Sequence, residues 1–162
     1  MTAVIADTDI LSTFGKVDGI GALRQLFETI YLAPAVYQEL LQAERMGFAW
    51  VSHITQIADI LPLTIEENRS VEQLVHQYPQ LGSGEVESFV LAESRRLLCL
   101  TNDRRAKIVA SGMGLSYLDL EEILRALKTQ GILTTDELAA LIDRIEREDR
   151  TRIKAKDDIL NR

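Results

Sequence analysis

The sequence predicts one α/β domain built on a parallel sheet, and three observations carry this prediction. Short apolar runs alternate with segments of helical periodicity along the chain, a pattern typical of parallel strands connected by helices. The runs are apolar at nearly every position, as in strands buried on both faces. The chain has 162 residues, of which 46% are hydrophobic, and this is enough for one domain with a proper core.

The first half of the chain begins with an expected strand over residues 3–6, which stops abruptly at Asp7. A second strand is expected over 29–33. Pro34 follows it, and proline is favoured in the first turn of a helix. Apolar residues then recur at helical spacing, so we expect a helix there. The run over 57–61 fits either a third strand or the end of a helix.

The middle of the chain is expected to hold two helices. Residues 66–78 have a helical pattern that Pro79 closes, because proline interrupts the hydrogen bonding of a helix. Ser83 is the expected N-cap of the next helix, since a serine hydroxyl can accept a hydrogen bond from the first turn. This places Glu85 in that first turn.

The clearest strand of the chain is expected over residues 97–101. A helix over 104–111 and a short strand over 115–118 should follow it. Asp119 can cap the next helix, because Glu122 stands three residues later and completes a capping box. This repeated alternation of strand and helix is the basis for predicting a parallel sheet.

The C-terminal part of the chain is expected to be helical and highly charged over residues 135–162. A narrow apolar stripe within it favours a helix packed on the domain, and a helix that binds a partner is the alternative. We therefore expect a main domain over residues 1–132 and a helical extension over 133–162.

The overall charge limits the classes of ligand. The formal net charge is −7, which argues against broad binding of nucleic acid through many basic side chains. It does not exclude a nucleic-acid enzyme in which divalent metal ions supply the positive charge locally.

The single cysteine and the termini limit the compartment and the kind of site. Cys99 lies in an apolar run and has no second cysteine to pair with, which excludes an intramolecular disulfide and a multi-cysteine zinc site. No apolar run approaches the ~20 residues of a membrane span. The N-terminus also lacks the pattern of a signal peptide, so we expect a soluble, cytoplasmic protein that does not associate with a membrane.

Two of the expected strands end at an acid, Asp7 and Asp103. Either acid could be simply a helix N-cap. On neighbouring parallel strands, however, the two would lie close together at one edge of the sheet. Like charges ~4 Å apart repel by ~4 kcal/mol at an effective dielectric constant of ~20, so such a pair needs a cation. Mg²⁺ is suited to this place, because it takes oxygen ligands and is often held by one or two carboxylates.

The order and spacing of these acids resemble the PIN domain, over about residues 3–120. The similarity is greatest to the prokaryotic VapC-like toxin subgroup, which has a Gly-Glu third motif. The resemblance implies a three-layer α/β/α sandwich. It rests on four motifs, namely Asp7-Thr8 after an apolar run, Pro34 to Leu40 with Glu39, Gly84-Glu85, and Leu100-Thr101-Asn102-Asp103.

The resemblance implies a metal-dependent ribonuclease that uses Mg²⁺ or Mn²⁺. It assigns both metal binding and catalysis to four acids: Asp7, Glu39, Glu85 and Asp103. Glu87 competes with Glu85 for the third position. Because a helix turns ~100° per residue, we expect Glu85 to face inward and Glu87 to face water.

The neighbours of the four acids are expected to have secondary roles. Asp9 either assists the metal site or caps a helix, and capping suffices to explain Asp119. Thr8 and Asn102 could orient ligands through hydrogen bonds. The bases after Asp103 are Arg104, Arg105 and Lys107; they either hold flanking phosphates or form a solvated helix face.

The resemblance also implies a biological setting and partners. The substrate would be RNA, and the protein would be the toxin of a toxin–antitoxin pair, inhibited by a small antitoxin protein. Homodimers are common in the family, so a homodimer is implied as well.

Two other functions remain open from the sequence. Asp7-Thr8-Asp9 fits the Asp-x-Asp motif of a haloacid-dehalogenase-like phosphatase, but neither Lys107 nor Lys128 sits convincingly for the lysine which that family needs. The second alternative is a non-catalytic PIN-like binding module. Metal-dependent activity that is lost on changing Asp7 or Asp103 would exclude it.

Overall fold

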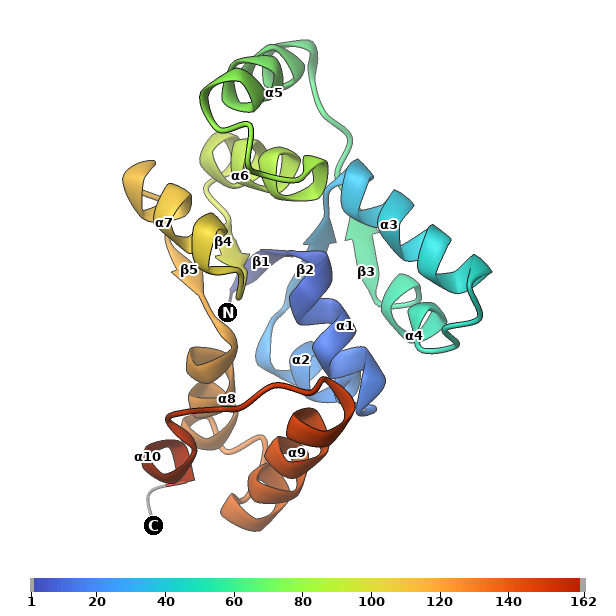
Figure 1. Cartoon of the computed structure of the whole chain (residues 1–162), viewed down its shortest axis with the longest axis vertical. Coiled ribbons are helices and arrows are strands. Elements are labelled where there is room, and N and C mark those ends of the chain that lie inside the picture. The colour runs from blue at the N-terminus through green and yellow to red at the C-terminus, as the bar shows by residue number, and fades with distance from the viewer. Residues whose placement is uncertain (1, 161–162) are drawn as a thin grey trace.

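The computed structural model describes residues 2–160, and its centre is a five-stranded sheet in which every pairing is parallel (Figure 1). The strands lie side by side in the order β3-β2-β1-β4-β5. The run over 57–61, which the sequence left open, contains a strand. The strands are β1 Ala3–Ala6, β2 Thr29–Leu32, β3 Ala58–Ile60, β4 Leu98–Leu100 and β5 Tyr117–Leu118.

Helices fill every connection between consecutive strands and continue beyond the last one. The sequence patterns did not single out α2 or α4, which are short. Within residues 2–160 the helices are α1 Thr8–Lys16, α2 Ile20–Leu26, α3 Pro34–Arg45, α4 Val51–Thr55, α5 Ile65–Gln77, α6 Ser83–Arg95, α7 Arg104–Gly112, α8 Leu120–Thr129, α9 Thr135–Glu148 and α10 Lys156–Leu160.

The direction of the connections places helices on both faces of the sheet. From β1 the chain moves outward through β2 to β3, and it then returns to the opposite side of β1 to form β4 and β5. Because such crossovers are right-handed, the reversal puts α1 to α4 on one face and α5 to α7 on the other. α6 packs against β1 and β4. The predicted layered α/β fold with a parallel sheet is thus confirmed.

The strand order also creates a switch point between β1 and β4, where connections leave in opposite directions. Ala6 is paired with Leu100 in the parallel register, and the backbone N–H of Asp7 donates to the carbonyl of Leu100 at 3.0 Å. Asp7 and Asp103 therefore follow neighbouring strands at the same edge, as predicted. In open α/β sheets, a crevice at such a point is the usual place for a ligand.

The core is continuous from the sheet to the C-terminal helices. Leu138, Leu141, Ile142 and Ile145 of α9 are all buried in the same apolar cluster as the central strands, so this helix packs on the domain. Cys99 is also buried, and burial raises the pKa of its thiol to about 12. It is an uncharged core residue. No helix within residues 2–160 combines the length and the apolar character needed to cross a membrane.

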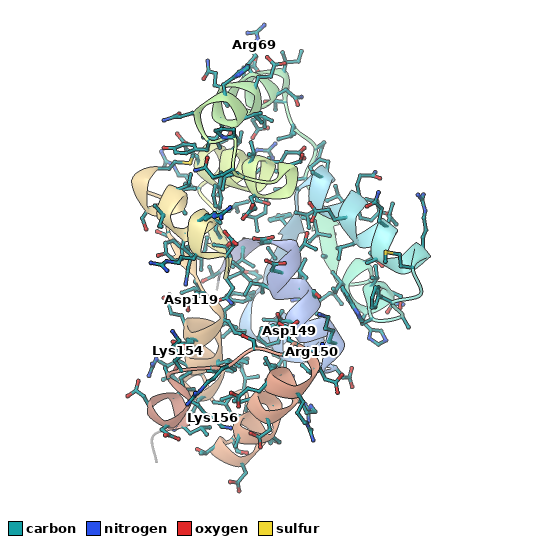
Figure 2. All side chains as sticks on the ribbon, viewed as in Figure 1. Arg69, Asp119, Asp149, Arg150, Lys154 and Lys156 are labelled. Atoms are coloured by element: carbon teal, nitrogen blue, oxygen red, sulfur yellow. The ribbon has the colours of Figure 1, made fainter. Side chains whose placement is uncertain are left out.

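The C-terminal extension is helical, as expected, but within the described residues it consists of two helices with a break between them. α9 ends at Glu148, and Arg150 has a left-handed φ of 48°, which a regular helix cannot contain. Asp149, labelled in Figure 2 where α9 meets α1, explains the break. Its carboxylate accepts hydrogen bonds from Thr13 at 2.8 Å and from Lys16 at 2.9 Å. α10 then forms separately, and residues 161–162 lie outside the description.

Candidate metal centre

Asp7 is the buried centre of the acidic edge. Asp7 is only 8% exposed to solvent, and the Thr101 hydroxyl donates a hydrogen bond to its Oδ2 at 3.1 Å. Burial raises the pKa of Asp7 from its ordinary 3.8 to about 7, with further increases from the charges of Asp9 and Glu85. Hydrogen bonds from the Thr101 hydroxyl and from the backbone of Asp9 offset only part of this cost. The ionised form of a carboxylate in such a position is destabilised, and a nearby cation would stabilise it.

Asp103 and Glu85 are both held by the starts of helices. Asp103 is the N-cap of α7, and its Oδ1 accepts a hydrogen bond from the Ala106 N–H at 2.9 Å. Glu85 is in the first turn of α6, and its Oε1 accepts from the Gly82 N–H at 3.0 Å. The N-cap of α6 is therefore Gly82, not Ser83 as predicted. The carboxylate of Glu85 satisfies the helix start, and a serine hydroxyl is not needed there.

Glu39 approaches the same edge from α3. Its Oε2 accepts a short hydrogen bond from the Thr8 hydroxyl, so Thr8 orients this acid as the sequence suggested. The close approach of α3 and α6 depends on Gly84. A Cβ at this position would lie 2.9 Å from Oε1 of Glu39 and 3.0 Å from Cγ2 of Val36. The Gly-Glu pair is thus a packing requirement as well as a source of one acid.

Electrostatic coupling shows that the four acids and Asp9 form one cluster. The pKa of Glu85 is raised by loss of solvation and by the charges of Asp103, Asp9 and Glu39. The pKa of Asp9 is raised by loss of solvation, by Asp103 and by Asp149. The carboxylates of Asp7, Asp9 and Glu85 are therefore more costly to ionise because of burial and of the neighbouring acids. Asp9 joins the cluster although its side chain is exposed in the first turn of α1.

The oxygen atoms that remain are suited to a hard divalent cation. Three of the acids each use one oxygen for a hydrogen bond within the protein. The second carboxylate oxygen of each of these acids accepts no hydrogen bond within residues 2–160. These free oxygens are Oε1 of Glu39, Oε2 of Glu85 and Oδ2 of Asp103. Carboxylate oxygens are the donors that Mg²⁺ and Mn²⁺ take in proteins. The donor set fits these ions.

The cluster is an open arrangement, not a closed cage of ligands. In the described part of the chain, no three His, Cys, Asp or Glu side chains stand close enough together to hold an ion by themselves. Mg²⁺ retains several waters and needs only one or two carboxylates, so this arrangement is compatible with it.

Two residues near the cluster have roles that differ from the prediction or were not predicted. Thr101 is buried and donates to Asp7; its position next to the end of β4 was the available signal. Glu87 does not face water. Its Oε1 accepts a hydrogen bond from the Ala35 N–H at 2.9 Å, which ties α6 to the first turn of α3. α3 carries Glu39, so Glu87 helps to position that acid.

The start of α8 is stabilised by three side chains, those of Asn102, Lys107 and Asp119. Oδ1 of Asn102 accepts from the Leu120 N–H at 3.2 Å, and within residues 2–160 no hydrogen bond joins this amide to an acid of the cluster. Lys107 donates to Asp119 at 3.3 Å, and Asp119 forms the predicted capping box with Glu122. Lys107 is thus paired with an acid outside the cluster. The phosphatase hypothesis requires a lysine beside Asp7, so this pairing argues against it.

A cavity of about 630 Å³ opens at the opposite edge of the sheet. Its lining includes Ala3 and Leu98, at the amino-terminal ends of β1 and β4, and none of the clustered acids. This cavity is therefore separate from the acidic site.

A family model described as a PIN domain matches residues 3–159, which is nearly the whole chain and includes every acid of the cluster. No curated protein matches the sequence.

Proposed function

The chain belongs to the PIN domain family, and on that premise we propose that it is a metal-dependent ribonuclease whose site is the acidic cluster. PIN domains are generally nucleases that depend on a divalent metal. The observation that carries the proposal is the gathering of acids from four separate elements at the switch point of the sheet. Among them, Asp7 has a pKa raised to about 7 without a basic partner among its causes.

The proposed ion, Mg²⁺ or Mn²⁺, would be bound by Asp7, Glu39, Glu85 and Asp103, with one or two of them as direct ligands and the others acting through waters that the ion retains. When bound, such an ion acidifies water and neutralises charge on a phosphodiester. The protein itself supplies orientation. Thr101 and Thr8 hold Asp7 and Glu39 through hydroxyl donors. The helix starts of α6 and α7 hold the other two acids through backbone N–H groups. Such fixed orientation of ligands supports metal affinity.

Cleavage of end-labelled single-stranded RNA tests the proposal. The purified protein is compared in Mn²⁺, in Mg²⁺ and in EDTA, alongside Asp7→Asn and Asp103→Asn. We expect cleavage only with metal and its loss in both variants. Asp59→Asn is the matched control, because Asp59 is exposed on the edge strand β3 and its change should leave cleavage intact. A wild-type protein that binds Mn²⁺ no better than Asp7→Asn would contradict the site.

The finer setting follows from the VapC-like resemblance: the protein would be the toxin of a toxin–antitoxin pair, with a small antitoxin as partner and a homodimer as the assembly. Expression of the chain in a bacterial host should then arrest growth, and expression of Asp103→Asn should not. Growth arrest by both forms would point to a non-catalytic binding module. Arrest by neither, with RNA cleavage intact in vitro, would argue against the toxin role alone.

A further inference from the structure

A second pocket adjoins the acidic cluster and contains no acid. It has a volume of about 380 Å³, within the range of sites for small ligands, and is lined by Tyr78, Gln80, Arg105, Ile108 and Val109. Three of these residues lie on one face of α7, and the other two belong to the connection between α5 and α6 (Figure 1).

Both walls of this pocket continue directly into the site. Arg105 stands two residues after Asp103, and Gln80 stands two residues before Gly82, whose N–H holds Glu85. Two residues span at most ~7 Å of backbone. The backbone at both walls of the pocket is therefore within ~7 Å of backbone that carries Asp103 or holds Glu85.

The chemistry of the lining is unusual for this acidic protein. Arg105 is the one charged residue in the lining. It is exposed, and within residues 2–160 it forms no ion pair or hydrogen bond. It lies in the first turn of α7, where a cation is unfavourable beside the helix macrodipole. Ile108 is 66% exposed, and the ring of Tyr78 is partly buried, with its hydroxyl accepting from Gln77 at 3.3 Å. A cation, an aromatic ring and apolar surface thus face one space.

We propose that this pocket binds a nucleotide adjacent to the scissile phosphate of single-stranded RNA, an inference that rests on the proposed ribonuclease function. Aromatic side chains and arginine are the groups that hold unpaired bases and backbone phosphates. The Tyr78 ring and the Ile108 surface receive the base, Arg105 binds its phosphate, and the amide of Gln80 can hydrogen-bond the base edge. Paired bases are stacked within a duplex and cannot enter, so the pocket selects unpaired RNA.

Binding of a fluorescein-labelled, unstructured 12-nucleotide RNA tests the pocket. Fluorescence anisotropy is measured with the Asp103→Asn protein, so that cleavage does not interfere. Stacking on one aromatic residue contributes enough that Tyr78→Leu should weaken binding about tenfold. Tyr78→Phe, which keeps the ring, should bind as the parent does. Arg105→Gln should also weaken binding about tenfold, whereas Arg69→Gln should not, because Arg69 lies at the far end of the molecule (Figure 2).

Ile108→Ala has an equally close control in Ile65→Ala. Both isoleucines are on helices, with exposures of 66% and 70%, and both variants lose the same apolar surface. Only Ile108→Ala should weaken RNA binding. A fold defect in any variant is detected by circular dichroism and thermal melting, and Tyr78→Phe keeps the test informative if Tyr78→Leu unfolds.

The kinetics of cleavage distinguish failure of this inference from failure of the proposed function. With the acids intact, Arg105→Gln and Tyr78→Leu should raise KM for RNA and leave kcat nearly unchanged, because they remove binding that the substrate and transition state share. If the wild type cleaves RNA and these variants bind and cleave like it, the pocket inference is wrong and the ribonuclease stands. If the wild type neither binds nor cleaves RNA, both are wrong.

Discussion

Replacing Asp7 with Asn should make the metal-free protein more stable at neutral and alkaline pH. Asp7 is buried, and burial together with Asp9 and Glu85 raises its pKa from 3.8 to about 7. Between these two values the folded state holds a proton that the unfolded state releases. The stability of the wild type therefore falls as pH rises through this range. Asn has the same shape, keeps an oxygen that can accept from Thr101, and carries no charge.

The size of the effect follows from the pKa shift of Asp7. The shift from 3.8 to about 7 is about 3 units, and each unit corresponds to about 1.4 kcal/mol, so the full cost is about 4 kcal/mol. It is fully present above the folded-state pKa. The advantage of Asp7→Asn should thus grow from about 2 kcal/mol at about pH 5 to about 4 kcal/mol at about pH 8.

Urea denaturation followed by circular dichroism, in EDTA and at several pH values, measures this advantage. Asp59→Asn serves as the control, because the exposed Asp59 should give a difference near zero at every pH. Excess Mg²⁺ should stabilise the wild type and leave Asp7→Asn nearly unchanged, since only the ionised carboxylate binds the ion. An advantage of Asp7→Asn that does not change between pH 5 and pH 8 would refute the reasoning.

Three further changes test the packing around the site. Gly84→Ala places a methyl group against Glu39 and should lower Mn²⁺ affinity at least about tenfold, as measured by calorimetric titration; unchanged affinity would separate Glu39 from the metal. Glu87→Ala removes the acceptor at the first turn of α3 and should lower the free energy of unfolding by about 1 kcal/mol, with a smaller loss arguing that water replaces the bond. Arg95→Ala leaves the buried Glu67 unpaired and should cost about 2 kcal/mol near pH 7. Arg95 lowers the pKa of Glu67 from 4.5 to about 2, so this cost should shrink as pH falls below 4.5, and a cost independent of pH would contradict the ion pair.

Much of the fold could be predicted because its signals are local. The apolar runs that became β1, β2 and β4 are typical of strands that are largely buried. An acid follows β1 and β4 within three residues, and Pro34 follows β2, so each strand end is marked in the sequence. Asp103 and Asp119 cap helices through N–H groups three residues away. Such contacts depend on a few consecutive residues, and a pattern of residue types is enough to reveal them.

One error arose from two competing local contacts, and two arose where a distant contact replaced a local one. Ser83 has the chemistry of an N-cap, but Glu85, two residues later, satisfies the same helix start. Glu87 was expected to face water because of its angle from Glu85, yet α3 presents an unsatisfied N–H on that side. The C-terminal helix was expected to continue, and it breaks where Asp149 binds side chains of α1. The outcomes for Glu87 and for the C-terminal helix depend on which element packs alongside.

The sequence by itself determined the parallel α/β class, the places where strands end, and the residue types that gather at the switch point of the sheet. The reason is that hydrophobic periodicity and helix capping act over a few positions. Only the tertiary structure decided that Thr101 supports Asp7, that Thr8 orients Glu39, and that Tyr78 and Arg105 line one pocket. These partners are far apart in the chain, and the packing of helices on the sheet, which no short pattern encodes, brings them together.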